Sequence, residues 1–181
     1  SAPDRVARMA PQGQAMAQGD AGDVALPQKL IRTGSMELKV EDIDGAVKAV
    51  GDLTSAQEGY VADTEVRRHE GGGAWAKLRV RVPSANFEAT LIALRSLGDV
   101  QLEKSTVEDV TKAYADLEIR LRLKKETEAR LRSLLQDRTA SLGDVIEVER
   151  ELSRVITEIE QLEGERRYFD QRIDTSTIAV R

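Results

Sequence analysis

The sequence has no cysteine and only one histidine, His69, among its 181 residues. Thiol nucleophiles, cysteine–histidine zinc sites and histidine-based catalytic triads are therefore excluded. Aromatic residues make up only 3% of the chain, and no apolar run approaches the roughly 18 to 20 residues that span a bilayer. The N-terminal residues also lack the apolar core of a signal peptide. We expect these residues to fold in water, without a cofactor or a bound metal.

Positive charge is also in the minority, because 27 Lys and Arg residues stand against 32 Asp and Glu residues, for a net charge of −5. A protein that binds nucleic acid through its overall field needs the opposite balance. We therefore expect no nucleic acid as a partner. An anionic surface would be held only by a local basic patch.

The chain begins with a segment that has little to bury. Residues 1–28 hold three of the four prolines and a stretch rich in Ala, Gln and Gly. This composition is typical of a disordered leader or tether, and equally of a linker remnant without a function.

Residues 29–107 alternate between strand and helix patterns. Apolar residues recur at every second position near residues 36–40, 60–66, 76–82 and 100–102, whereas residues 43–53 and 87–97 carry helical stripes. Asp42 and Ser84 precede these two stripes as candidate N-caps. The order predicts an α+β fold, a ferredoxin-like (βαββαβ) antiparallel sandwich with both helices on one face.

Residues 108–173 contain no proline and keep apolar residues at heptad-like spacings of 3 and 4. This pattern predicts a long antiparallel coiled-coil helical hairpin, interrupted at Lys124, Glu128 and Arg166. Its turn is predicted at residues 139–144, where Ser141 and Asp144 can cap the second helix. Residues 174–181 return to alternation and predict a final strand that rejoins the sheet beside the first strand or a central one. We expect the full-length chain to continue beyond this strand.

Three groups of residues are candidates for chemistry or binding. His69 lies next to Gly71, Gly72 and Gly73, which we interpret as a solvated hairpin turn. Asp109 and Asp116 are seven residues apart, too far to share one proton, and Asp109 suits the start of a helix. A basic stripe with one aromatic residue is a possible ligand face for an anionic lipid headgroup, a glycan or a small molecule: Trp75, Lys77, Arg79 and Arg81.

The hairpin carries more apolar surface than its own seam requires. Leu134, Leu135, Leu142 and Val145 gather at its turn, and Ile146 and Ile156 widen the apolar face of the second helix. Excess apolar surface favours a partner or a second copy. The alternative is a hairpin that packs only against itself or against the sheet.

Several ordered motifs make the chain resemble the bacterial domain-of-unknown-function family DUF4349. They include Arg32-x-Gly34-x-Met36 and residues 58–61 (EGYV), 78–83 (LRVRVP), 107–111 (VEDVT), 149–152 (EREL) and 176–178 (STI). The resemblance implies an envelope lipoprotein or membrane-anchored protein. A lipid-anchored cysteine before Ser1 or a transmembrane helix after Arg181 would supply the anchor. The resemblance to this family implies no known activity.

These observations lead to one hypothesis and one alternative. We expect a non-enzymatic extracytoplasmic module of a membrane-anchored envelope protein, in the periplasm or at the cell surface. Its hairpin would bind another envelope protein or a second copy, and it would meet the membrane only through anchors outside these residues. The alternative is a ligand-sensing domain that binds on the sheet face. An enzyme that uses only carboxylates is the third possibility.

Overall fold

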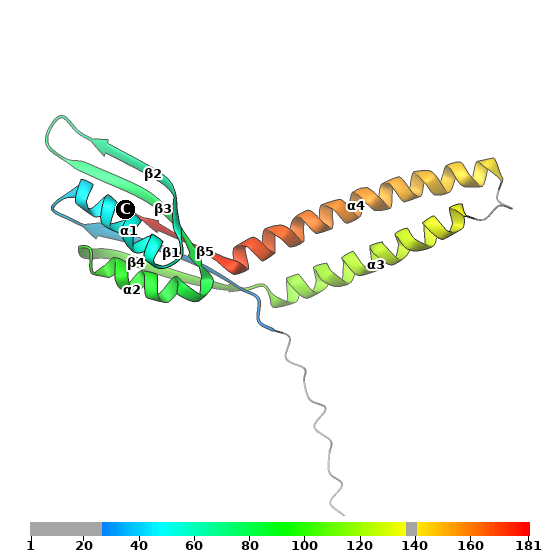
Figure 1. Cartoon of the computed structure of the whole chain (residues 1–181), viewed down its shortest axis with the longest axis horizontal. Helices are drawn as coiled ribbons and strands as arrows, with labels where there is room; N and C mark the ends of the chain where they lie inside the picture. The colour runs from blue at the N-terminus through cyan, green and yellow to red at the C-terminus, as the bar shows by residue number, and fades with distance from the viewer. Residues whose placement is uncertain (1–26, 137–140) are drawn as a thin grey trace, which may run out of the picture.

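The computed structural model describes residues 27–136 and 141–181, so most of the predicted leader, 1–28, and part of the predicted turn lie outside the described residues. The described residues form an α+β fold with one five-stranded sheet and four helices (Figure 1). In chain order the elements are β1 (Leu30–Lys39), α1 (Ile43–Ala56), β2 (Tyr60–Arg68), β3 (Ala74–Pro83), η1 (Ser84–Asn86), α2 (Phe87–Arg95), β4 (Asp99–Asp109), α3 (Thr111–Leu135), α4 (Leu142–Asp174) and β5 (Thr175–Val180).

The sheet is mixed, with the strand order β2-β3-β5-β1-β4, so the prediction of an antiparallel sheet is wrong. Strand β5 pairs antiparallel with β3 and parallel with β1. The reason is geometric, because a helical hairpin returns the chain to the end of the sheet that it left. Strand β5 therefore runs opposite to β4, and β1 is also antiparallel to β4. Both expected neighbours of the last strand, β1 and a central strand, are its partners.

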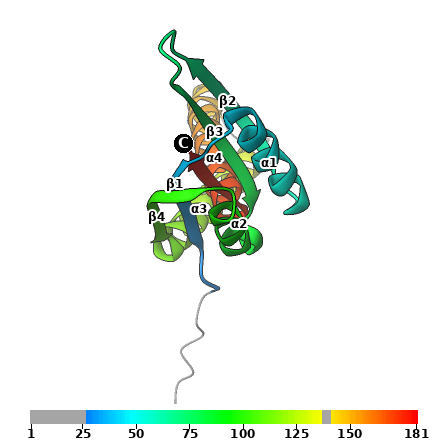
Figure 2. The same cartoon turned by 90° about the vertical axis from the view of Figure 1, so that its left-hand side faces the viewer.

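Helices α1 and α2 cover one face of the sheet, and the main core lies between them and the strands (Figure 2). The α2 helix is held close to β1 because Gly34 lets the Phe87 ring approach; a Cβ at Gly34 would lie 3.3 Å from that ring. The core consists of aliphatic residues from alternate strand positions and from the helices, together with Phe87: Met36, Val50, Leu78, Val80, Val82, Phe87, Leu91, Leu94, Ile178 and Val180.

Local signals placed some helix ends correctly and others wrongly. The Asp42 side chain accepts hydrogen bonds from the backbone N–H groups of Asp44 and Gly45, so the predicted N-cap of α1 is confirmed. Ser84 does not cap α2, because the η1 turn intervenes and its hydroxyl bonds elsewhere. Strand β4 continues through Asp109, and the first long helix begins at Thr111, three residues later than expected.

Helices α3 and α4 form a hairpin that projects from one end of the sheet (Figure 1). The α4 helix alone has 33 residues, which corresponds to about 50 Å at 1.5 Å per residue. Within the described residues, no helix combines the length and the apolar character that crossing a membrane requires.

Candidate interaction surface of the helical hairpin

Both helices of the hairpin grow directly out of strands. Only Val110 separates β4 from α3, and α4 passes into β5 between Asp174 and Thr175 without a loop. The Thr175 backbone N–H still donates to the Gln171 carbonyl, so the last helical hydrogen bond overlaps the first strand residue. The hairpin is therefore joined to the sheet by two short connections, and β5, its second anchor, lies in the centre of the sheet.

The root of the hairpin is fixed by polar contacts around Tyr114. The Tyr114 hydroxyl donates a hydrogen bond of 2.6 Å to Asp170 across the two helices. This hydrogen bond, followed by burial, raises the pKa of Tyr114 to about 12. The Lys29 ammonium lies 4.6 Å from the centre of the Tyr114 ring, and its backbone N–H donates to the Thr111 hydroxyl at 2.9 Å. The residue that precedes β1 and both helices of the hairpin thus meet at one point.

A second contact ties the end of α4 to η1, which directly follows β3. The Ser84 hydroxyl donates to the Ile173 carbonyl at 2.6 Å and lies 2.9 Å from the hydroxyl of the fully buried Ser176. This satisfies a carbonyl in the last turn of α4, which otherwise lacks a helical partner. Sequence reasoning missed this role, because Ser84 also fits an ordinary cap pattern.

A separate hydrophobic cluster holds the two helices together. Its buried members come from both arms, Leu117 and Leu121 from α3 and the rest from α4: Leu117, Leu121, Val155, Ile159 and Leu162, with Leu131 and Phe169 packed against them. All seven follow the heptad-like spacing of apolar residues that the sequence shows over residues 108–173. Because this cluster is distinct from the core of the sheet, the hairpin is stabilised mainly by its own helix–helix contact.

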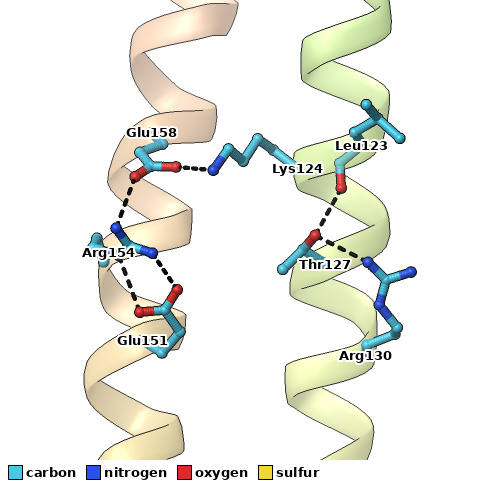
Figure 3. Close-up of polar contacts among 7 residues, drawn as sticks. All are labelled: Leu123, Lys124, Thr127, Arg130, Glu151, Arg154 and Glu158. Carbon is cyan, nitrogen blue, oxygen red and sulfur yellow. Dashed lines mark hydrogen bonds and ion pairs between the residues drawn. The ribbon is translucent and has the colours of Figure 1, made fainter.

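Charged residues flank this cluster and connect the helices (Figure 3). Lys124 forms an ion pair with Glu158, and Lys125 forms one of 2.6 Å with Glu163. On α4, Arg154 also binds Glu151 through hydrogen bonds of 3.0 and 2.5 Å. Lys124 interrupts the apolar pattern of α3, yet it is paired across the hairpin. Hydrogen bonds from the two lysines lower the pKa values of Glu158 and Glu163.

The far end of the hairpin presents apolar side chains to solvent. Leu142 is 77% exposed, Leu134 55% and Ile146 42%. Leu135, Val145 and Ile156, the other predicted partner-binding residues, are half-buried. We call Leu134, Leu142 and Ile146 the tip residues. Ser141 and Asp144 form the predicted capping box at the start of α4, which is confirmed.

An apolar pair on the outer side of α3 was missed by sequence reasoning. Ile119 and Leu123 are 45% and 52% exposed and lie one turn apart. The sequence did contain a signal for this pair, because Ile119 and Leu123 are four residues apart and neither belongs to the seam of α3. Exposed apolar side chains of the hairpin therefore occur on α3 as well as at the tip residues.

The predicted ligand face lies on β3, away from the hairpin seam. Trp75, Lys77, Arg79 and Arg81 alternate with buried core residues and so point to the face that α1 and α2 leave open. Three cations lie near the Trp75 ring: Lys77 at 5.1 Å, Arg67 at 5.4 Å and Arg181 at 5.9 Å. The four residues share one face, but Trp75 lies at the far end of β3 from the hairpin.

The other candidates for chemistry are structural or isolated in this fold. The Asp109 carboxylate accepts hydrogen bonds from the backbone and hydroxyl of Thr111, which lower its pKa. It therefore serves the start of α3, whereas Asp116 is exposed on that helix. His69 is exposed in the β2–β3 turn, where Gly72 adopts a φ of +92°.

Comparison with known proteins gave one match. Searches among curated proteins and among solved structures found nothing similar. The model of the family described as "Domain of unknown function (DUF4349)" matches residues 28–181, which include every described strand and helix. The chain therefore belongs to the DUF4349 family.

Proposed function

We propose that this protein is a non-enzymatic extracytoplasmic interaction module of a membrane-anchored envelope protein. Its hairpin binds another envelope protein or a second copy of the chain. The single observation that carries the proposal is the exposure of the tip residues at the end of an arm fixed to the sheet. Large apolar side chains that are exposed together to water are unfavourable in free energy unless a partner covers them.

The mechanism is helix-on-helix recognition. We interpret the hairpin as an antiparallel coiled coil, since its buried residues follow a heptad pattern, and the sandwich as a ferredoxin-like arrangement with β5 inserted between β1 and β3. Tip residues supply apolar contact area, and the charged residues of both signs beside the seam set the register of the partner helices. Nucleic acid is not among the proposed partners, because the net charge of −5 opposes its binding.

Photocrosslinking in intact cells tests this proposal directly. A photoreactive residue at position 142 of the full-length protein is compared with one at position 77 on the sheet face. We expect a discrete adduct from position 142 that is absent from position 77, and its mass separates a second copy from another protein. Adducts from position 77 alone would instead favour ligand sensing on the sheet face.

A pair of matched variants tests whether the tip residues themselves are responsible. Leu134→Asp combined with Ile146→Asp, with the photoreactive residue kept at position 142, should remove the adduct while leaving the thermal unfolding of the sheet unchanged. The control carries Ile92→Asp and Leu102→Asp, which alter two similarly exposed residues of the sandwich. If the control removes the adduct as well, or the tip variant keeps it, the hairpin is not the binding surface.

A further inference from the structure

A cavity of about 640 Å³ lies at the end of the sheet opposite the hairpin root. It forms because β3 reaches past the end of β5: the ladder between these strands stops at Leu78 and Val180, while β3 begins at Ala74. The first turns of α1 lie over the resulting gap. Three lining residues with small side chains, Ala46, Ala74 and Ala76, leave the space unfilled.

One wall of this cavity is aliphatic. Leu38 and Val180 come from the sheet, Ile43 and Val47 come from α1, and Leu97 closes one side. A volume of this size and a mainly apolar lining with a few polar groups are usual for sites that bind small molecules. This aliphatic wall itself carries no hydrogen-bonding side chain and so suits a hydrocarbon chain, whereas the rest of the lining includes seven charged residues and Gln101.

The charged residues that line the cavity have both signs: Lys39, Arg68 and Arg181 against Glu37, Glu41, Asp42 and Asp44. Most of them already have partners. Arg68 pairs with Asp44 at 2.6 Å, and Asp42 caps α1. Within residues 27–136 and 141–181, Lys39 and Glu41 have no ion-pair partner within 4.0 Å. One cation and one anion are thus left at the cavity, which suits a head group that carries both charges.

We propose that this cavity binds a zwitterionic single-chain amphiphile. The alkyl chain lies along the aliphatic wall, and the head group lies among the charged residues, with its anion toward Lys39 and its cation toward Glu41. Trp75 belongs to the lining although it points to the open face of the sheet, because β5 ends opposite Leu78 and leaves the sheet open beside Trp75. It is the only tryptophan of the chain, so its emission reports binding. This site is separate from the hairpin, so it does not depend on the function proposed for the tip residues.

The test is a titration of tryptophan emission with dodecylphosphocholine below its micellar concentration. We expect a saturable emission shift, no response to free phosphocholine, and about tenfold weaker binding of dodecanoate and dodecyltrimethylammonium, which corresponds to about 1.4 kcal/mol. An absent or non-saturating response, or equal affinity for the three chains, overturns the proposal.

Variants of the lining separate cavity binding from adsorption to the surface. Ala46→Phe fills the cavity from α1 and should abolish the shift, whereas Ala89→Phe, on an exposed position of α2 outside the lining, should leave it unchanged. Ala76→Leu fills the cavity from β3 and replaces Ala46→Phe if that variant does not fold. Unaltered binding by a folded cavity-filling variant overturns the proposal.

Discussion

Two glycines of α1 and its exit turn show how a single Cβ atom affects this fold in opposite ways. A Cβ at Gly59 would lie 2.5 Å from a Val82 methyl group and closer still to the Arg81 carbonyl, so the turn after α1 depends on its absence. A Cβ at Gly51, inside α1, meets nothing within 4 Å. The role of Gly59 depends on contacts with Arg81 and Val82, more than 20 residues away, which the sequence alone does not reveal.

We predict opposite changes in stability for the corresponding alanine variants. Gly59→Ala should lower the free energy of unfolding by about 1–3 kcal/mol, because β3 must shift to accept the methyl group. Gly51→Ala should raise it by about 0.5–1 kcal/mol, because alanine restricts the unfolded chain and favours the helix. Urea unfolding followed by circular dichroism measures both changes. Equal effects of the two variants would contradict the packing described for Gly59.

The hydrogen bond between Tyr114 and Asp170 gives the hairpin root a measurable signature. Tyr114→Phe removes a bond to a charged acceptor, so we expect a loss of roughly 1.5–3 kcal/mol in the free energy of unfolding. The control is Tyr60→Phe, because Tyr60 is exposed on β2 and should contribute almost nothing. A loss confined to Tyr60→Phe would be inconsistent with the contacts at the root.

The same bond predicts a change of stability at alkaline pH. The folded-state pKa of Tyr114, about 12, is higher than its ordinary value of 10.0, so folding favours the protonated form. Its contribution is complete below pH 10 and is lost as the pH rises toward 12. Ultraviolet titration should show one tyrosine that ionises near pH 12 in the folded protein, and Tyr114→Phe should remove that transition.

Most secondary-structure elements were predictable because their periodicity is local. Alternation marked the strands, and the spacing of Leu117 and Leu121 on α3 and of Val155 and Ile159 on α4 marked the hairpin. The end of β4 was missed, since Glu108 and Asp109 suit the first turn of a helix as well as the end of a strand. The ion pairs of Lys124 and Lys125 were also missed, because sequence gives no register between two helices.

These ion pairs predict that the hairpin weakens in acid. The folded-state pKa values of Glu158 and Glu163 are lower than the ordinary 4.5, so their contribution is present above pH 4.5 and is lost as the pH falls through the folded values. Both pairs are partly exposed, so the effect should shrink in high salt.

Paired variants isolate this contribution. Lys124→Met with Lys125→Met should flatten the fall in melting temperature between pH 7 and pH 3, measured from helical circular dichroism. Lys48→Met, which removes an exposed lysine from α1, should leave the fall unchanged. If the melting temperature falls equally in the parent, in the double lysine variant and in Lys48→Met, the acid sensitivity arises elsewhere in the chain.

At the scale of the whole molecule, the sequence predicted that the last strand rejoins the sheet but not where it lies. Strand order depends on contacts between distant segments, and the alternation of Ile178 and Val180 fits an edge or a central position. The central position of β5 has a mechanical consequence. Two neighbouring strands hold β5 on both sides, so the helix that runs into it is held by the core of the sheet.

The direct passage from α4 into β5 predicts that the hairpin and the sheet move as one body. Two glycines inserted between Asp174 and Thr175 should uncouple them, because they interrupt the last helical turn and separate the Ser84–Ile173 contact from the strand. The chain has no cysteine, so cysteines introduced at the exposed positions 52 and 147 are unique sites for spin labels.

Double electron–electron resonance then measures the distances between the spin label at position 52 on α1 and the one at position 147 on α4. We expect a narrow distribution for the parent and a broad one for the insertion, while the same insertion in the glycine turn at residues 71–73 leaves it narrow. In intact cells, the adduct from position 142 should weaken only with the insertion after Asp174, because a loose arm presents its tip residues to the partner less often. A narrow distribution in that variant would mean that the Tyr114 contacts alone hold the arm, and the joined helix and strand would then have no mechanical role.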